Sequence, residues 1–410
     1  WDARIDRRFI DASTEGFDAV KALVRDYTPK MVADLCGILE ADVLTAARWF
    51  GAAVAALSLW CLGLNKSAQG THKNLALINL HLATGQIGRP GAGPFSLTGQ
   101  PNAMGGREVG GMVTALSGHR DPANPDHRAE IAALWGVDSV PSVPGLPAVA
   151  MFDAIGQGKI KAVWIACTNP AHSMPDANAV RAALAGCEFV VLQEAFADTD
   201  TAPYAALLLP AASWGEKEGT VTNSERRISR VRQAVPPPGE ARADWAIACD
   251  FAQRLSRRLG RGADLFPYTQ PAEIFAEHTR TTTGRDLDIS GLDYATLEAL
   301  GPQQWPMPQG ATEGTARLYT DGVSATDTGR ARFYPVRHKG VAEPTNARTP
   351  FHLLTGRLRD QWHGMSRTGC VPSLFAHTRE AVATLHPNDL LRRGIAEGDL
   401  VRLSNKHGSW

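Results

Sequence analysis

The residues between 94 and 111 combine glycine with polar and charged side chains in a pattern that suggests a ligand site. This stretch, PFSLTGQPNAMGGREVGG, contains five glycines together with Gln100, Asn102, Met104 and the pair Arg107–Glu108, which looks buried. Glycine tolerates positive φ and lets the backbone approach a ligand closely. A long glycine-rich surface loop would have the same composition. The choice between the two interpretations therefore depends on the rest of the sequence.

Three further polar clusters interrupt the chain. They are TNP at 168–170, WGEKEGTVTNSERRI at 214–228 and TGRLRDQWHG at 355–364. The first has an ordinary explanation as a β-to-α turn capped by asparagine, and the second as a solvated charge run, although Gly219 and Thr220 favour a loop over a helix there. The third combines a Thr–Gly–Arg turn suited to phosphate with Trp and His. Taken singly, no cluster establishes a site.

Taken together, these clusters predict a ligand that is long, anionic and planar in parts. Lys217 and Arg357 supply positive charge for phosphates, and arginine does so with a bidentate fork. Asp244 and Glu194 are acidic and can accept hydrogen bonds from the N–H edge of a guanine or from ribose hydroxyls. A dinucleotide cofactor would satisfy all of these groups.

The residues from 161 to 210 predict the framework that positions them. Short β-rich runs alternate with a helical run, which is typical of a parallel sheet with right-handed crossovers, so we expect the α/β class. In such sheets ligands bind beyond the carboxyl ends of the strands, which would place Thr168–Asn169 and Gln193–Glu194 at a site. The chain has no GxGxxG fingerprint, and a standard NAD fold is therefore disfavoured. The expected elements are strands at 162–167, 188–194 and 206–210 and a helix at 178–184.

Other parts of the chain also carry clear patterns. Residues 1–49 have helical periodicity. A buried strand is expected within 56–64, and amphipathic patterning predicts a long helix at 241–259. After a linker-like stretch at 341–350, a separate β-rich domain is expected, which looks truncated. The remaining expected elements are a helix at 73–84, strands at 351–356 and 399–404, and a helix at 387–393.

Composition excludes several classes of protein. The 410 residues include 42 basic and 42 acidic ones, so electrostatics gives no case for nucleic acid or an anionic membrane surface. The longest apolar run, 50–64, is shorter than the roughly 20 residues that a spanning helix needs.

The cysteines form no CxxC and the histidines no HExxH, so no zinc or iron–sulfur ligand set is encoded. We expect most cysteines to be small buried hydrophobes in a reducing compartment. Because the chain begins at Trp1 without methionine, we expect it to be a piece of a longer protein.

The chain resembles the catalytic subunit of molybdenum nitrate reductases, most closely the assimilatory, cytoplasmic branch. The resemblance runs through essentially the whole chain and is carried by residues 73–111, 214–228, 237–245 and 355–364. It implies Rossmann-like parallel-sheet domains of the molybdopterin oxidoreductase fold, followed by the start of a C-terminal β-barrel. The implied domains are the end of one α/β cofactor domain at 1–60, an α/β molybdopterin-cofactor domain at 61–345, and a truncated dinucleotide-binding barrel at 346–410.

The resemblance also implies two molybdopterin guanine dinucleotides around one molybdenum, with a [4Fe–4S] cluster feeding electrons. Arg107 falls where the family places an arginine beside the substrate funnel, and Met104 of the same loop is assigned a catalytic position. Arginine there would hold nitrate, because an anion leaving water needs a compensating cation. The implied cofactor contacts are Leu62, Lys66, Asn169, Gln193, Glu194, Lys217, Asp244, Thr355, Gly356, Arg357, Trp362 and His363.

The chain departs from the family in places. Lys66 stands where relatives usually have glutamine, and Ala206 where the family often has aspartate. The cysteines for the molybdenum and the [4Fe–4S] cluster lie in the family's N-terminal region, so no metal ligand is expected in this chain. This polypeptide alone is therefore expected to be inactive. The implied partners are nitrate and an electron donor, either ferredoxin, flavodoxin or an NADH-linked reductase, with no nucleic acid and no membrane.

Two alternatives to nitrate reduction remain open at this point. Formate dehydrogenase shares the fold and the pterin contacts, although the 94–111 loop favours nitrate. The second alternative is not an enzyme: the chain would keep the cofactor fold as a remnant and serve as a non-catalytic scaffold. A serine hydrolase is disfavoured because the chain contains no GxSxG.

Overall fold

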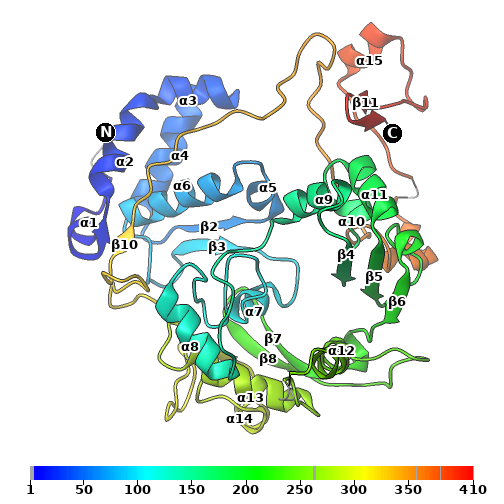
Figure 1. Cartoon of the computed structure of the whole chain (residues 1–410). Helices are drawn as coiled ribbons and strands as arrows, with labels where there is room; N and C mark the ends of the chain where they lie inside the picture. Colours follow the sequence, from blue (N-terminus) through cyan, green and yellow to red (C-terminus); the bar gives the residue numbers. More distant parts are fainter. Residues whose placement is uncertain (1–3, 262–264, 357, 379, 410) are drawn as a thin grey trace. The chain divides into compact units, whose positions relative to one another are not determined.

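The chain divides into two compact units, each assembled from separate stretches of sequence. The computed structural model describes residues 4–261, 265–356, 358–378 and 380–409. Unit 1 takes the residues up to 143 with 219–230 and 274–344, and unit 2 takes 144–218, 231–273 and 345 onward. Figure 1 labels the elements of both units.

Unit 1 is mostly helical. Strands β2 and β3 pair in parallel, with Leu57 opposite Gly93, and α6 forms the connection between them. The 56–64 stretch is a strand only as far as Trp60, because the chain then turns into α5. The elements of unit 1, with the parts of β8 and α13 that cross its boundary, are α1 (Arg7–Ser13), β1 (Thr14–Glu15), α2 (Phe17–Leu23), η1 (Val24–Asp26), α3 (Pro29–Cys36), α4 (Glu40–Ala52), β2 (Leu57–Trp60), α5 (Leu62–Asn65), α6 (Gly70–Ala83), β3 (Gly93–Ser96), α7 (Ala103–Glu108), α8 (Pro125–Trp135), β7 (Gly219–Thr222), β8 (Arg227–Val231), α13 (Pro271–Thr282), α14 (Tyr294–Leu300), β9 (Gln303–Gln304) and β10 (Ala331–Arg332).

The largest core of unit 1 gathers around Trp305 and Met307, which follow β9. Ile228 of β8 and Phe275 of α13 join it, and Met104 of α7 packs against it from a half-buried position. Strands β7, β8 and β9 form one small sheet beside this core. The loop that contains α7 therefore lies on a packed base.

Unit 2 is built on a three-stranded parallel sheet in the order β4–β5–β6. In chain order its elements are α9 (Ala148–Gly156), β4 (Ala162–Ala166), α10 (Pro170–Ser173), α11 (Ala177–Gly186), β5 (Phe189–Glu194), η2 (Ala202–Tyr204), β6 (Leu207–Pro210), η3 (Trp214–Glu216), α12 (Asp244–Arg258), η4 (Thr368–Cys370), η5 (Pro372–Phe375), α15 (Pro387–Arg393), β11 (Ser404–Asn405) and β12 (Gly408–Ser409). The α/β class and the parallel sheet predicted from the sequence are confirmed.

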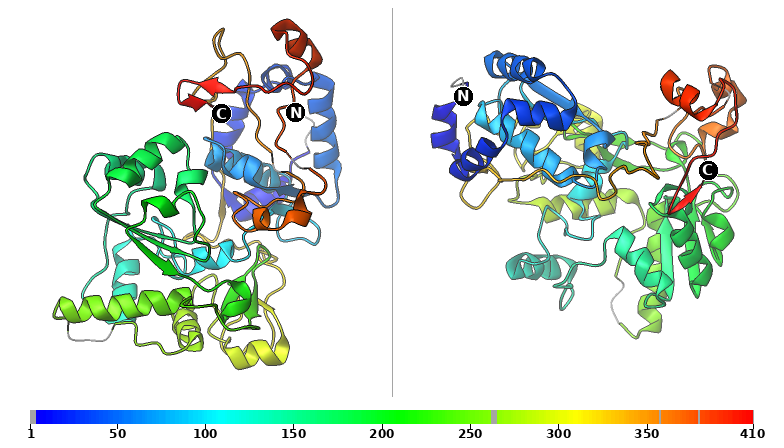
Figure 2. Two further views of the ribbon diagram at one scale, coloured as in Figure 1. Left: turned by 90° about the vertical axis from the view of Figure 1, so that its right-hand side faces the viewer. Right: turned by 90° about the horizontal axis from the view of Figure 1, so that it is seen from above.

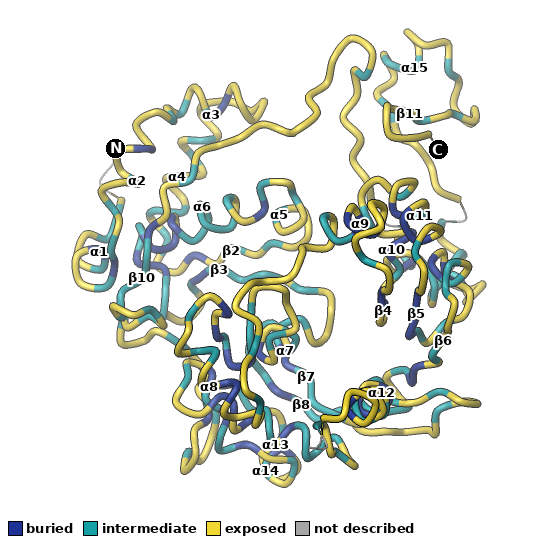
Figure 3. Tube along the Cα trace, viewed as in Figure 1, coloured by how far each residue is buried: buried dark blue, intermediate teal, exposed yellow. Residues whose placement is uncertain are grey.

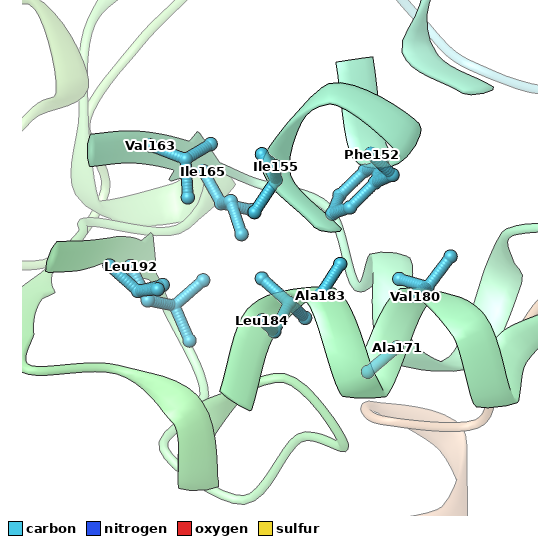
Figure 4. Close-up of a cluster of buried hydrophobic side chains, with 10 residues drawn as sticks. Phe152, Ile155, Val163, Ile165, Ala171, Val180, Ala183, Leu184 and Leu192 are labelled. Atoms are coloured by element: carbon cyan, nitrogen blue, oxygen red, sulfur yellow. The ribbon is translucent and has the colours of Figure 1, made fainter. Parts of the chain in front are cut away.

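Side chains that alternate along the strands build the core of unit 2. Val163 and Ile165 of β4 pack with Leu192 of β5 against residues of α9 and α11, such as Leu184 (Figure 4). In Figure 2 these two helices lie beside the sheet, and Figure 3 shows buried residues on β4 and β5 and on the helices that pack against them. Trp164 points to the other face, where its ring meets Phe251 of α12 at 4.9 Å between centroids. Helices therefore cover both faces, as a parallel sheet requires.

The predicted helices are confirmed, but the predicted C-terminal strands are largely absent. Helices α6, α11, α12 and α15 occupy the expected stretches. Residues 351–356 are irregular, and of 399–404 only Ser404 enters a strand, in the β11–β12 hairpin. Leu354 and Leu400 stay exposed. A strand needs a partner for its backbone hydrogen bonds, and the described C-terminal residues offer only this hairpin, with no closed barrel.

The expectation that most cysteines are buried was wrong. Only Cys249 is buried, whereas Cys36, Cys61, Cys167 and Cys370 are exposed. Each lies near apolar residues in sequence, but burial depends on which element packs over it.

Within the described residues, no helix has both the length and the apolar character needed to cross a membrane.

Candidate functional site

The carboxyl edge of the β4–β5–β6 sheet gathers polar side chains, as the strand order predicts. Cys167 and Asn169 follow β4, while Gln193 and Glu194 end β5. Asp244 is the first residue of α12, where an acidic side chain interacts favourably with the helix dipole.

Asp244 is the centre of a hydrogen-bond network at this edge. Its Oδ1 accepts from Gln193 Nε2 at 2.8 Å and from Cys167 Sγ at 3.4 Å. Its Oδ2 accepts from Lys217 Nζ at 2.5 Å. Burial alone would raise the pKa of Asp244, but the hydrogen bonds from Lys217 and Gln193 outweigh it and hold the pKa below its ordinary value. The carboxylate therefore stays ionised at neutral pH and remains an acceptor.

Cys167 belongs to this network, although the sequence analysis did not select it. Its backbone has a φ of 56°, in the left-handed region, at the point where β4 turns into the following loop. Burial raises the pKa of the Cys167 thiol to about 11, and the charge of Asp244 adds to the effect. The thiol therefore stays protonated and donates its hydrogen. Its place one residue before the TNP turn was the available sequence clue.

The side chain of Asn169 organises a loop and does not cap a helix. Its Oδ1 accepts from the backbone N–H of Thr201 at 3.1 Å and from the Thr201 hydroxyl at 2.7 Å, and its Nδ2 donates to Asp200 at 3.1 Å. Asn169 precedes α10, but only its backbone carbonyl accepts from the helix, and its side chain makes no capping hydrogen bond. The Glu194 carboxylate accepts from the next backbone N–H, that of Ala195, at 2.8 Å.

Three polar groups of unit 2 have buried atoms without a hydrogen-bond partner among the described residues. They are the side-chain amide of Gln361, a residue only 5% exposed, the hydroxyl of Thr199 and the ring Nε1 of Trp164. Buried polar atoms are usually hydrogen-bonded, so the Gln361 amide and the Thr199 hydroxyl fit a polar ligand, whereas the Trp164 ring packs against Phe251 of α12. Next to Gln361, the rings of Trp362 and His363 meet edge to face at 4.5 Å. Thr355 and Gly356 lie in exposed irregular backbone, and Arg357 lies outside the described residues.

The other sequence candidates belong to unit 1. Leu62 is the first residue of the short helix α5 that follows β2, Lys66 comes directly after the helix, and both are exposed. Arg107 of α7 is exposed, and its guanidinium makes no hydrogen bond or ion pair with any residue that the structure describes. The prediction that Arg107 and Glu108 are both buried is therefore confirmed only for Glu108, which is 2% exposed, whereas Arg107 is exposed.

The structure thus brings Gln193, Lys217 and Asp244 together, adds Cys167, and places Asn169 at the same sheet edge. Within the described residues, no group of three or more His, Cys, Asp or Glu side chains is arranged to hold a metal ion. The arrangement suits an organic, partly anionic ligand that meets a carboxylate, an ammonium group and an amide.

Comparison with known families shows which family the chain belongs to. The family model described as "Molybdopterin oxidoreductase" matches residues 21–254 of this chain. The model described as "Molydopterin dinucleotide binding domain" matches residues 351–410. The chain belongs to the molybdopterin oxidoreductase family. The two matched regions include the Asp244 network and Gln361, respectively.

Individual relatives agree with this assignment. The chain is 45% identical over 389 residues to a nitrate reductase from Synechocystis, covering 93% of this chain and 53% of that protein. It is 34% identical over 404 residues to the alpha subunit of an F420-dependent formate dehydrogenase from Methanocaldococcus jannaschii, covering 98% and 58%. Acetylene hydratase from Pelobacter acetylenicus has a similar fold, with a TM-score of 0.67 at 17% identity, covering 100% of this chain and 58% of that one. The chain spans about half the length of the curated relatives it matches.

Proposed function

We propose that this chain is part of the catalytic subunit of an assimilatory nitrate reductase, which reduces nitrate to nitrite at a molybdenum bound by two molybdopterin guanine dinucleotides. The similarity to a nitrate reductase over 93% of the chain supports the proposal. The structural observation that carries it is the exposed Arg107, whose guanidinium has no partner among the described residues. A cation of this kind compensates an oxyanion for the loss of water.

The residues of unit 2 fit the guanine dinucleotide part of the cofactor. Oδ2 of Asp244 accepts only from Lys217 among the described residues, so the carboxylate retains capacity for an N–H donor of a guanine edge. Lys217 supplies positive charge for phosphate, and its ammonium also lies 5.7 Å from the centre of the Trp214 ring. The unpartnered amide of Gln361 fits a polar part of the same ligand.

The proposed division of labour follows from these placements. When bound, the molybdenum centre supplies oxygen-atom transfer from nitrate together with two electrons. In unit 2, Gln193, Asn169 and Glu194 hold the turns that would surround the dinucleotide, and in unit 1 Leu62 and Lys66 would contact the cofactor. Arg107 would attract and orient nitrate, and Met104 would pack beside it.

Other parts of the proposal concern the longer protein. The [4Fe–4S] cluster would be bound outside this chain, as the family resemblance implies. The electron donor would be ferredoxin, flavodoxin or an NADH-linked reductase, and the protein would act in the cytoplasm in nitrate assimilation. The domain boundaries at 60 and 345 stay a prediction.

Assays of the full-length protein test this function. Purified protein should contain molybdenum and release guanine nucleotide on denaturation, and with reduced viologen it should convert nitrate to nitrite. Formate oxidation without nitrate reduction would instead assign the activity of the Methanocaldococcus relative. Absence of both molybdenum and guanine nucleotide would assign a non-catalytic scaffold.

A further inference from the structure

A single residue of β7 holds both ends of helix α7. The backbone N–H of Thr222 donates to Oδ1 of Asn102, the residue before the helix, at 2.9 Å. The hydroxyl of the same Thr222 donates to Oε2 of Glu108, the last residue of the helix, at 2.9 Å. Thr222 is only 4% exposed and Glu108 only 2%, so bulk water does not compete for the hydrogen bond between them, whereas the hydrogen bond to the exposed Asn102 is only partly buried.

The other carboxylate oxygen of Glu108 ties α7 to the core of unit 1. Trp305 Nε1 donates to Oε1 of Glu108 at 2.6 Å, and Trp305 is itself buried in the core cluster. The backbone carbonyl of Glu108 accepts from the N–H of Gly118 at 2.8 Å. The side chain and backbone of Glu108 thus contact three segments that are far apart in sequence.

These ties determine the conformation of α7, because the helix is too short to be stable by itself. Isolated helices below about 12 residues are marginal in water, and α7 has 6. Its close approach to Asn102 also requires glycine at position 105, where an added Cβ would come within 2.1 Å of Asn102 Oδ1. Gly105 therefore leaves room for the side chain of Asn102 beside the helix.

Fixing Glu108 also fixes the direction of its neighbour Arg107. Successive side chains of an α-helix point about 100° apart, so an inward Glu108 directs Arg107 away from the core. This is the observed arrangement, with Glu108 2% exposed and Arg107 on the surface of unit 1.

We propose that Thr222 and Glu108 are positioning residues that hold the Arg107 guanidinium in place for an oxyanion substrate. The proposal deepens the nitrate reductase assignment and rests on it for the identity of the anion. It assigns a role to the second half of the 214–228 cluster, whose first half carries Lys217. Thr222 never touches the substrate and acts only through Glu108 and the helix.

The test compares Thr222→Val with Thr222→Ser in the full-length protein. Valine keeps the shape and the backbone N–H but removes the hydroxyl, whereas serine keeps the hydroxyl. Thr14→Val is a matched control, because Thr14 is also 4% exposed and its hydroxyl also makes one hydrogen bond, to the Ile10 carbonyl at 2.6 Å. Thr14 lies in β1, and no hydrogen bond among the described residues joins it to α7.

Two measurements are made on each variant. Hydrogen–deuterium exchange of residues 102–111 reports on the helix whether or not the protein is active. The KM and kcat for nitrate, with molybdenum content as a check on loading, report on the use of Arg107.

We expect Thr222→Val to speed amide exchange within 102–111 and to raise KM for nitrate about five- to tenfold, with a smaller change in kcat. Thr222→Ser should restore both values, and Thr14→Val should change neither. Unchanged exchange in Thr222→Val would overturn the positioning role of the hydroxyl. Faster exchange with an unchanged KM for nitrate would show a merely structural role and overturn the proposal as well. A wild-type protein that lacks nitrate reduction would defeat the functional assignment, and the exchange data would still decide whether Thr222 holds α7.

Discussion

The side-chain amide of Gln193, at the end of β5, donates to the carboxylate of Asp244, the first residue of α12, over 2.8 Å. This contact joins a strand end to a helix start 51 residues later in the chain. Gln193 was expected at the sheet edge, and Asp244 was expected to bind the same ligand from a separate motif, so the contact places both at one site. Lys217 and Cys167 complete the group around the same carboxylate.

Replacing Asp244 should weaken cofactor retention and the fold of unit 2. Asp244→Asn keeps the shape but removes the charge that Lys217 and Cys167 meet, so we expect a loss of about 1 kcal/mol in the free energy of unfolding, discounted for partial exposure. We also expect reduced guanine-nucleotide content in purified protein. Urea denaturation and nucleotide release measure the two effects.

Asp250 offers a control on the same helix for the Asp244 prediction. It pairs with Arg242 and Arg254 at the surface, so Asp250→Asn should leave nucleotide content unchanged. Equal nucleotide loss in the two variants would argue against a role for Asp244 in binding the cofactor.

Replacing Arg107 should impair nitrate binding with little effect on stability. Arg107→Gln removes a charge-assisted hydrogen bond to the substrate, which corresponds to a rise in KM of roughly 10- to 100-fold. Steady-state assays with reduced viologen measure it. Arg48→Gln is the control, since Arg48 lies exposed on α4 and donates only to Thr45 among the described residues. An unchanged KM for nitrate in Arg107→Gln would contradict the role of Arg107 in binding nitrate, on which the proposed function rests.

The thiol of Cys167 should react slowly despite its exposure. Only the thiolate is nucleophilic, and with a pKa of about 11 on the order of 1% of this thiol is ionised at pH 9. In cofactor-free protein, we expect alkylation at Cys167 to rise with pH toward 11 and to lag behind alkylation at the exposed Cys36. Mass spectrometry of labelled peptides provides the rates.

The same labelling tests the cause of the raised pKa. Asp244→Asn removes the negative charge that disfavours the thiolate, so the pKa of Cys167 should fall and its labelling at pH 9 should accelerate. Labelling that is insensitive to this substitution would mean that Asp244 does not control the thiol.

A cavity in the core of unit 2 should be costly. Leu192 is fully buried between β4 and the helices, and Leu192→Ala should lower the free energy of unfolding by about 2–4 kcal/mol through lost burial and the cavity left behind. Leu207→Ala on the neighbouring strand is the matched control, because Leu207 is 43% exposed and should lose under about 1 kcal/mol. Similar losses in denaturant titrations would contradict the observed core.

The local pattern of the sequence predicted the β4–β5–β6 sheet of unit 2, its helices and the position of the polar turns at the sheet edge. The short β-rich runs at 162–167, 188–194 and 206–210 predicted strands, and βαβ order predicted that they pair in parallel. Parallel strands end at one edge, so residues that follow them were expected at a common site. The charge of Lys217 and the acceptor oxygens of Asp244, which come from two other motifs, already suited a dinucleotide, and the family resemblance then identified that ligand as molybdopterin guanine dinucleotide.

Only the tertiary structure decided which polar groups share a partner. No local pattern pairs Cys167 with Asp244, or Thr222 with Glu108, which lies 114 residues away. The strand expected at 351–356 did not form for the same kind of reason, since strands depend on pairing with another segment. Periodicity reports what a residue prefers among its near neighbours. Hydrogen bonds and burial between distant residues depend on how finished elements pack, and that arrangement exists only in three dimensions.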